Sequence, residues 1–468
     1  MRNKTLKIAI LLGLGLFFIN ACLGKPAPVK HDGVGAWSKS EINLAKMNAN
    51  LNEKNANLNK FGEKFKGENA AASEFGEDFK NKSANLNEFN SKINEGANAH
   101  FSDFGEGFKN KFNADFKSEK STLPVILNFA GEANFTRLKS DLKKANLHLR
   151  IFGDSHTAAD FFSSRLREHI KTNAVGFIYP LQPKYQRVVP VSYKSKNFEL
   201  LNSKSKDTQA NFAMGGIIAK ALKKGAFITL DNEKNPKSTL VAVYKSPHTK
   251  DAFVIKDGKN KRFVLRAQKR GKWSFARIKS ANFPLKITAL DKNVLLGGFF
   301  ILNEKNNAVI DTLGINGAKS DLWQKWNEGV FLEQLNLYKS DIVVLAYGSN
   351  DALVGGFDEA QFKQGYKKLI ALLYRSNPQT HIVLIAPPTI THKVGKGYEL
   401  HEDFYRVQKA LYELARDERL VLFDMHAVIE NSGGKAAWIE QNLSREDVHL
   451  TPAGYQKMAD EFYQSLMR

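Results

Sequence analysis

The chain has 468 residues, of which 43% are apolar, and a formal net charge of +21. This length and apolar content allow two or three domains with a sizeable core. The single cysteine excludes an intrachain disulfide, so the folded part must be stabilised by its own core. The positive charge indicates an anionic partner, for which nucleic acid, an acidic membrane and an acidic cell-wall polymer are the candidates.

The N-terminus has the pattern of a secretory signal. Basic residues precede the apolar run IAILLGLGLFFI, which is too short to span a bilayer comfortably. The following Ile19-Asn20-Ala21-Cys22 resembles the lipobox of bacterial lipoproteins, which implies a signal peptide over 1–21 and lipidation of Cys22. A plain signal peptide beside an incidental cysteine is the alternative. Export favours phospholipid head groups or wall carboxylates over nucleic acid as the partner of the basic surface.

A low-complexity segment follows, over residues 22–121. Asn, Lys, Glu, Ala and Phe dominate it, and two motifs recur: NANLN or SANLN, and FGE followed by K, D or G and then FK. Single Phe or Leu anchors in such repeats bury little surface, so we predict a flexible or loosely helical spacer. A wall-binding repeat is the alternative.

Globular character begins near Leu123. The apolar run from Leu147 to Phe152 predicts a buried strand, and ADFFSSRLREHI has apolar positions at helical spacing. These elements place the first part of an α/β domain at 122–183. Residues 184–305 then show many short β-type runs, which predict an inserted antiparallel β-sandwich of jelly-roll type, interrupted by one helix over GGIIAKALKK.

Strands and helices alternate again over residues 306–468. The strands are AVIDTLG, DIVVLAYGSND, HIVLIAPP and LVLFDMHAV, and the last helix is TPAGYQKMADEFYQSLMR with Thr451 as its N-cap and Pro452 as its first residue. Apolar strands alternating with amphipathic helices predict a parallel sheet covered on both faces. The predicted fold is therefore α/β, a three-layer sandwich with a parallel central sheet and an inserted β-sandwich.

Reactive residue types gather where the predicted strands end and before the last helix. In parallel sheets, the carboxyl ends of the strands are where functional groups collect. A serine between a strand and a helix is commonly only an N-cap, and each group taken alone is weak evidence. The four groups are Gly153-Asp154-Ser155-His156, Gly314 to Ala318, Gly348-Ser349-Asn350-Asp351 and Glu446-Asp447-Val448-His449.

Together these residue types suit acyl transfer. A serine hydroxyl is a poor nucleophile at neutral pH and needs an imidazole to accept its proton, and the imidazole needs a carboxylate to orient it. The tetrahedral oxyanion needs donors already in place, which the main-chain N–H groups of Ser155 and Gly317 and the side-chain amide of Asn350 can provide. A glycine at 317 allows close approach of the backbone to substrate.

The four groups resemble the Ser, Gly, Asn and His blocks of the SGNH (GDSL) hydrolases. More narrowly, GDSHTAADFF, GINGA, YGSND and DVHLTPAGY, with a β-sandwich inserted after the first block, resemble bacterial O-acetylpeptidoglycan esterases. The resemblance implies Ser155 as nucleophile, His449 as base, and Ser155, Gly317 and Asn350 as the oxyanion hole. It also implies a carbohydrate-binding-like insert and removal of the C6 acetyl group of muramic acid through an acetyl-enzyme.

The acidic partner of His449 is open between two residues. The general family pattern places an aspartate three positions before the histidine, where this chain has Glu446, and Asp447 lies two before. We favour Asp447, because a short carboxylate in a tight loop reaches its neighbour's Nδ1.

Asp424-Met425-His426 is a second D-x-H pair, which we place within a strand and interpret as structural. His156 is expected to begin a helix, with substrate contact as the alternative.

The sequence therefore predicts an exported, membrane-anchored periplasmic lipoprotein esterase acting on O-acetylated peptidoglycan strands. No HExxH, CxxC or phosphate-loop pattern occurs, so we expect no metal, nucleotide or other cofactor, and no nucleic-acid partner. Three alternatives remain open: an O-acetyltransferase that uses the same site, a non-catalytic wall-binding or adhesive lipoprotein, and a lipid esterase.

Overall fold

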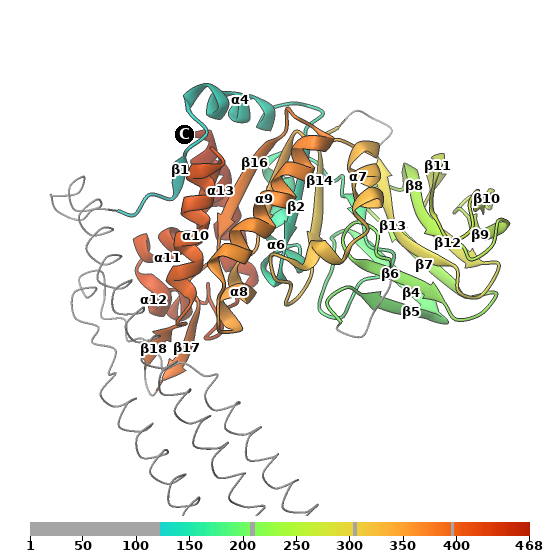
Figure 1. Ribbon diagram of the computed structural model, residues 1–468. Helices are drawn as coiled ribbons and strands as arrows, with labels where there is room; N and C mark the ends of the chain where they lie inside the picture. Colours follow the sequence, from blue (N-terminus) through green and yellow to red (C-terminus); the bar gives the residue numbers. More distant parts are fainter. Residues whose placement is uncertain (1–121, 206–210, 303–306, 395–396) are drawn as a thin grey trace, which may run out of the picture. The chain divides into compact units, whose positions relative to one another are not determined.

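The computed structural model describes residues 122–205, 211–302, 307–394 and 397–468 (Figure 1). The predicted signal peptide, Cys22 and the spacer over 22–121 lie outside the described residues. Within the described part, no helix has the length and apolar character needed to cross a membrane. Leu123–Gly397 and His401–Arg468 form one compact unit, which holds both the α/β part and the β-sandwich.

A six-stranded sheet forms the centre of the α/β part. Five of its strands run parallel, and the short edge strand β1 pairs antiparallel with β19. Strands β2, β14 and β16 are buried along their whole length, as expected for a sheet covered on both faces. In spatial order the strands are β1 (Ile126–Asn128), β19 (Val421–Asp424), β16 (His381–Ala386), β15 (Ile342–Ala346), β2 (His148–Gly153) and β14 (Val309–Gly314).

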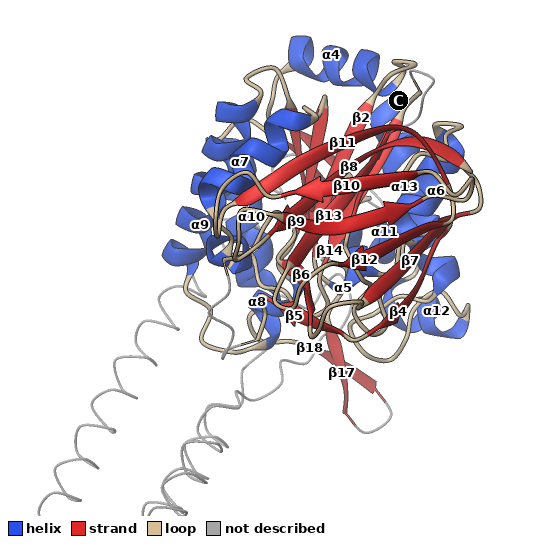
Figure 2. Cartoon of the chain, turned by 90° about the vertical axis from the view of Figure 1, so that its right-hand side faces the viewer, coloured by secondary structure: helices blue, strands red, loops and turns tan. Residues whose placement is uncertain are grey.

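Helices lie on both sides of this sheet (Figure 2). One layer holds α7 (Glu328–Leu337), α8 (Ser349–Leu353), α9 (Glu359–Ser376) and α10 (Phe404–Asp417). The other layer holds α6 (Phe161–His169), α11 (Met425–Asn431), α12 (Gly434–Glu440) and α13 (Pro452–Met467). The remaining short elements are α4 (Glu132–Leu142), α5 (Ser155–Ala158), the 3-10 turn η2 (Leu322–Lys325), β17 (Thr391–Val394) and β18 (Gly397–Leu400).

Period-two alternation in β2 distributes its side chains between the two helix layers. Leu149 and Ile151 belong to the core that includes Phe462 of α13, whereas Phe152 packs edge-on against Phe331 of α7, with 5.8 Å between ring centroids. The last helix begins as predicted, because the Thr451 hydroxyl accepts a hydrogen bond from the Gly454 N–H at 3.2 Å and Pro452 occupies the first helical position.

Two antiparallel sheets form the inserted β-sandwich, and the predicted fold class is confirmed. One sheet has the order β10 (Arg262–Arg266), β9 (Asp251–Lys256), β12 (Leu285–Ala289), β7 (Phe227–Asn232) and β4 (Val191–Lys196). The other has the order β11 (Trp273–Asn282), β8 (Lys237–Lys245), β13 (Leu295–Leu302), β6 (Ile217–Ala221) and β5 (Phe198–Asn202), with β3 (Gly176–Ile178) also paired to β13. Their facing apolar side chains form a second core.

The helix predicted over GGIIAKALKK is wrong. Ile217–Ala221 is the strand β6, which pairs with β5 on one side and β13 on the other. A short apolar run does not distinguish a buried strand from a helix by periodicity. Here the neighbouring strands decide, because four of the five β6 residues are fully buried in the ladder.

The β-sandwich also begins earlier than the predicted boundary at 184, since β3 already pairs with β13. The Asp311 carboxylate of β14 links β3 to the central sheet, because it accepts the Phe177 N–H at 2.9 Å and the Arg150 Nε–H at 2.6 Å. Burial would raise the pKa of Asp311, but the adjacent His148 and Arg150 hold it well below its usual range. The two parts of the molecule are therefore joined by a fully buried ionic cluster.

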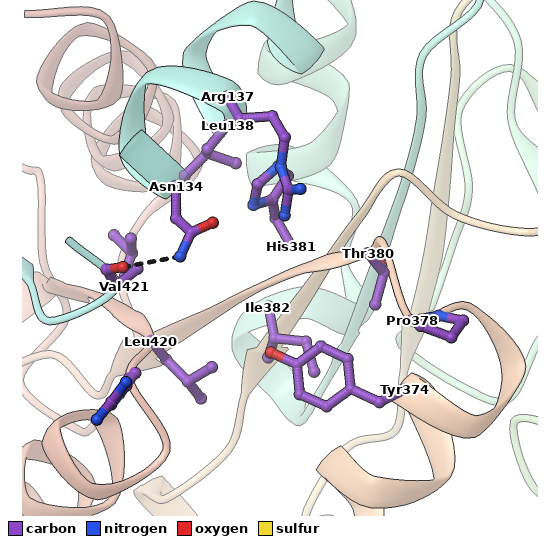
Figure 3. Close-up of a pocket in the computed structure, with 12 residues that line it drawn as sticks. Asn134, Arg137, Leu138, Tyr374, Pro378, Thr380, His381, Ile382, Leu420 and Val421 are labelled. Carbon is purple, nitrogen blue, oxygen red and sulfur yellow. Dashed lines mark hydrogen bonds between the residues drawn. The ribbon is translucent and has the colours of Figure 1, made fainter. Parts of the chain in front are cut away.

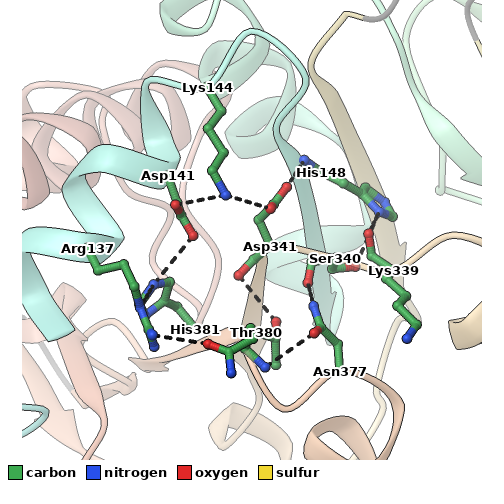
Figure 4. Close-up of polar contacts among 11 residues, drawn as sticks. Arg137, Asp141, Lys144, His148, Lys339, Ser340, Asp341, Asn377, Thr380 and His381 are labelled. Atoms are coloured by element: carbon green, nitrogen blue, oxygen red, sulfur yellow. Dashed lines mark hydrogen bonds and ion pairs between the residues drawn. The ribbon is translucent and has the colours of Figure 1, made fainter.

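A polar network ties the amino ends of the central strands (Figure 4). Asp341 accepts hydrogen bonds from the His148 N–H at 2.8 Å and from the Lys144 ammonium at 3.1 Å. The Asn377 amide donates to the Ser340 carbonyl at 2.8 Å. These bonds fix loops at the edge of the sheet opposite the carboxyl ends of the strands.

Candidate active site

Three central strands end in register at the carboxyl edge of the sheet. Gly153 at the end of β2 lies opposite Gly314 of β14 and opposite Ala346 of β15. Ser155, Gly317 and Asn350 each follow one of these ends within four residues. Parallel pairing therefore brings the starts of three loops that are distant in sequence to one place.

Ser155 begins the short helix α5, and its side chain is not the cap. Asp154 is the N-cap: its carboxylate accepts the His156 N–H at 2.9 Å. Gly153 makes the tight turn possible, because a Cβ there would lie 2.2 Å from Thr157 Oγ1 and 2.8 Å from Ala346 O. The Ser155 N–H, in the first turn of a helix, has no intrahelical acceptor.

His449 lies between Ser155 and Asp447. Its Nε2 is 3.0 Å from the Ser155 Oγ, and its Nδ1 is 3.2 Å from Asp447 Oδ2. Asp447 Oδ1 also accepts the main-chain N–H of His449 at 2.8 Å. Partial burial would raise the pKa of Asp447, but these hydrogen bonds and the charge of His449 lower it, so the carboxylate is ionised at neutral pH. Serine, imidazole and carboxylate thus form one hydrogen-bonded chain.

Two hydrogen bonds to main-chain carbonyls hold the loop that carries Asp447 and His449. The Lys435 ammonium, at the start of α12, donates to the Asp447 carbonyl at 2.6 Å. The Arg445 N–H donates to the His449 carbonyl at 2.9 Å. Lys435 is buried, which lowers its pKa to about 8 against the opposing effect of the Asp447 charge. Sequence reasoning missed Lys435, since nothing in a short glycine-flanked helix marks one lysine as buried.

The Gly317 and Asn350 loops are bonded to each other. The Asn350 amide donates to the Ala318 carbonyl at 3.0 Å, and Asp351 accepts the Ser320 hydroxyl at 2.8 Å. An amide nitrogen carries two N–H donors, so Asn350 keeps one for another acceptor. Gly317 has a φ of +73°, a left-handed conformation that glycine adopts without strain.

Two protein families match the chain. Residues 300–457 match the GDSL-like Lipase/Acylhydrolase family, and residues 174–286 match the N-terminal domain of the peptidoglycan O-acetylesterase family. Residues 300–457 therefore carry a GDSL-like lipase/acylhydrolase domain. The two matches indicate a carboxylic ester hydrolase, and the second one covers the β-sandwich from β3 into β12.

One solved structure shows the same fold over most of the chain. A structure of a peptidoglycan O-acetylesterase is 23% identical, covers 73% of this chain and 98% of its own, and superposes with a TM-score of 0.64. An acetyl xylan esterase is 25% identical over 33% of this chain and 79% of its own, with a TM-score of 0.27. No curated protein sequence matches the chain.

In this GDSL-like hydrolase, His156 is a buried neighbour of the site. It is the second residue of α5, and its Nδ1 lies 2.9 Å from the Tyr455 hydroxyl of α13. Its ring centroid is 5.7 Å from that of His449. Burial, and then the charge of His449, lower the pKa of His156 to about 3, so its imidazole is neutral at working pH. A second imidazolium therefore does not form next to His449.

The second D-x-H pair of the hydrolase is placed differently from the prediction. The strand β19 ends at Asp424, and His426 already lies in α11, so the pair does not lie within a strand. Asp424 caps this helix by accepting the His426 N–H at 2.8 Å. The His426 Nδ1 lies 2.8 Å from Thr389 Oγ1. The apolar run predicted that the strand continues past Asp424, but the helix cap ends it there. Asp424 and His426 each have a hydrogen-bond partner within the fold.

A cavity of about 260 Å³ lies at the other edge of the sheet (Figure 3). Arg137 and His381 line it, and His381 is the first residue of β16, at the amino end of that strand. The cavity is thus separate from the Ser155 site. Among the residues that the structure describes, no three His, Cys, Asp or Glu side chains are grouped so as to hold a metal ion.

Proposed function

We propose that this hydrolase is a serine esterase that removes the O-acetyl group from the C6 hydroxyl of muramic acid in peptidoglycan. The hydrogen-bonded chain from Ser155 through His449 to Asp447 supports the chemistry. The match of residues 174–286 to the N-terminal domain of peptidoglycan O-acetylesterases supports the substrate. The observation that carries the proposal is the 3.0 Å approach of the His449 Nε2 to the Ser155 Oγ.

Acylation follows from this geometry. His449 Nε2 accepts the Ser155 proton as Oγ attacks the acetyl carbonyl carbon, and Asp447 stabilises the resulting imidazolium through Nδ1. The Ser155 and Gly317 N–H groups and the second N–H of Asn350 are the donors for the oxyanion. When the intermediate collapses, the bond from the acetyl carbon to the sugar oxygen breaks. His449 then gives its proton to that oxygen, which leaves as the free hydroxyl.

Deacylation repeats these steps with water. His449 removes a proton from a water molecule as the water oxygen attacks the acetyl-Ser155 carbonyl, in the same oxyanion hole. Collapse releases acetate, and the proton returns from His449 to the Ser155 oxygen. The reaction consumes one water molecule and produces acetate and the deacetylated sugar, and each proton transfer uses His449.

The test is acetate release from O-acetylated peptidoglycan by wild type and by Ser155→Ala. We expect the variant to lose activity by at least about 1,000-fold, because the remaining donors alone give little turnover. Ser195→Ala, an exposed serine of β4, is the matched control and should retain full activity. Retained acetate release in Ser155→Ala would overturn the proposal. Such a result would favour a non-catalytic wall-binding protein with a contaminating esterase.

An O-acetyltransferase would use the same acyl-enzyme and differ only in its acceptor. Incubation with an acetyl donor and a deacetylated glycan separates the two activities. We expect free acetate as the product and no acetylated glycan. Acetylated glycan in excess of acetate would replace the esterase assignment with the transferase.

We infer that the protein acts outside the cytoplasm, as a lipoprotein anchored in the membrane through Cys22. The support is the basic, apolar and small-residue order of residues 1–22. Wild type should incorporate labelled fatty acid and sediment with membranes, and Cys22→Ser should do neither. An unlabelled wild-type protein in the soluble periplasmic fraction would contradict the anchor and leave the esterase proposal intact.

A further inference from the structure

The β-sandwich supplies a lysine to the rim of the Ser155 site. Lys204 lies two residues after the end of β5, and its side chain covers Gly317. A Cβ built on Gly317 would lie 2.1 Å from Lys204 Nζ and 2.8 Å from its Cε. The ammonium therefore occupies the space beside a residue that we assign to the oxyanion hole.

The main chain at Lys204 is held firmly against the α/β part. The preceding Ser203 is buried: its hydroxyl accepts the Trp326 indole N–H at 3.3 Å, and its carbonyl accepts the Lys325 ammonium at 3.0 Å. The Lys204 N–H itself donates to Asn202 Oδ1 at 2.9 Å. No carboxylate in the described ranges forms an ion pair with the Lys204 ammonium. A fixed backbone thus presents an exposed cation at the site.

An exposed aromatic residue lies on the loop between β3 and β4. The Tyr185 side chain is 79% exposed, the highest value among the large apolar side chains that the structure describes. Its backbone has a φ of +64°, which is uncommon for a residue with a side chain. The Lys184 ammonium lies 4.7 Å from the centroid of the Tyr185 ring, and the rest of the ring is open to solvent.

This loop is attached to the site at two points. The Arg187 N–H donates to the Ala158 carbonyl, at the end of α5, at 3.2 Å. The Asn316 amide donates to the Lys184 carbonyl at 3.5 Å. Tyr185 therefore lies between a contact with the helix of Ser155 and a contact with the residue before Gly317.

We propose that Tyr185 and Lys204 form a substrate-binding rim that takes an acetylated sugar carrying a carboxylate. Tyr185 packs against the apolar face of the sugar ring, and Lys204 pairs with the lactyl carboxylate of the same sugar. This deepens the proposed function and rests on it, because muramic acid carries a lactyl group whose carboxyl or attached peptide lies on the acetylated sugar. Specificity for anionic acetyl esters would then come from the β-sandwich, and the reaction from the α/β part.

The charge is tested with one matched pair of substrates, 6-O-acetyl-N-acetylmuramic acid and its lactyl amide, which differ only in the carboxylate. Lys204→Gln should raise KM for the acid about 5- to 10-fold, leave kcat within 2-fold and leave hydrolysis of the amide unchanged. Lys204→Arg should retain the preference. Lys223→Gln, an exposed lysine after the far end of β6, is the control and should behave as wild type.

Two results would overturn the role of Lys204. Equal losses on the acid, the amide and p-nitrophenyl acetate would place its ammonium in the chemical step and not in recognition. Unchanged kinetics on all three would remove it from the site. Because the probes are small esters, both outcomes can be measured even if wild type releases no acetate from peptidoglycan. That last result would contradict the proposed function and not the role of Lys204.

Tyr185 is tested on the same substrates. Tyr185→Ala should raise KM for both acetylated sugars by a similar factor of about 5, with p-nitrophenyl acetate unaffected, and Tyr185→Phe should remain close to wild type. Val264→Ala removes an exposed apolar side chain of β10 and serves as control. An equal response of p-nitrophenyl acetate, or no response of either sugar, would overturn the stacking role.

Discussion

Lys435 donates a hydrogen bond from Nζ to the main-chain carbonyl of Asp447 at 2.6 Å, which places a buried ammonium directly behind the His449 loop. The bond comes from the start of α12 and reaches a residue that otherwise contacts His449 through its side chain. Lys435 thus holds the position of the carboxylate, and we treat it as a positioning residue.

Lys435→Met is expected to lower kcat about 10-fold with little change in KM, because the loop loses its donor while substrate contacts remain. Its pKa of about 8 adds a second readout. Wild-type kcat should decline with a midpoint near pH 8 as the ammonium loses its charge, and Lys435→Met should lack this step. Glu440→Gln on the same helix is the control. An unchanged kcat and pH profile in Lys435→Met would contradict the positioning role.

Two isosteric amide substitutions, Asp447→Asn and Glu446→Gln, distinguish which carboxylate orients His449. Asp447→Asn should lower kcat by roughly 100-fold, because an amide neither holds the His449 tautomer nor stabilises the imidazolium. The loss is smaller than for a buried triad carboxylate, since the Asp447 side chain is 59% exposed. Glu446→Gln should cost less than 3-fold. Steady-state kinetics on p-nitrophenyl acetate measure both, and a larger loss in Glu446→Gln would reverse the assignment.

Asn350→Ala should lower kcat by about 100-fold while KM stays within 3-fold, as expected for a donor used in the transition state. The change also removes the bond to Ala318 O, so thermal unfolding should accompany the kinetics. A fall in kcat without a matching fall in melting temperature supports the donor role. Gln379→Ala removes an exposed amide at the opposite edge of the sheet and should change neither kcat nor the melting temperature.

The lowered pKa of His156 makes the free energy of unfolding depend on pH. Its pKa is about 3 in the folded state and 6.5 when exposed, so the unfolded chain binds a proton between these values that the folded chain does not. The free energy of unfolding of wild type should therefore fall as pH falls through this window, with a slope of at most about 1.4 kcal/mol per pH unit from this group. In His156→Gln this contribution is absent.

Urea unfolding of wild type and His156→Gln at pH 7, 6, 5 and 4 measures the effect. The stability advantage of wild type over the variant should shrink steadily from pH 6.5 downwards. His248→Gln, a half-exposed histidine beside Asp291, controls for the loss of an imidazole as such. A constant difference between wild type and His156→Gln across these pH values would show that His156 protonates equally in both states.

Much of the architecture could be predicted from sequence because its signals are local. The apolar run of β2, the helical spacing in α6 and the Thr451 cap each depend on residues a few positions apart. The order of strands and helices then implies a parallel sheet, and a parallel sheet places its strand ends together. The sequence alone therefore indicates that Ser155, Gly317 and Asn350 belong to one candidate site.

Other features depend on contacts between distant segments, which local patterns do not contain. The neighbours β5 and β13 make Ile217–Ala221 a strand, and a cap ends β19 at Asp424. Ser155 and His449 are 294 positions apart in the sequence, and their Oγ and Nε2 atoms approach to 3.0 Å only in the folded chain. Lys204 and Lys435 are two ordinary lysines in the sequence, and only tertiary packing gives one an exposed place over Gly317 and the other a buried place behind Asp447.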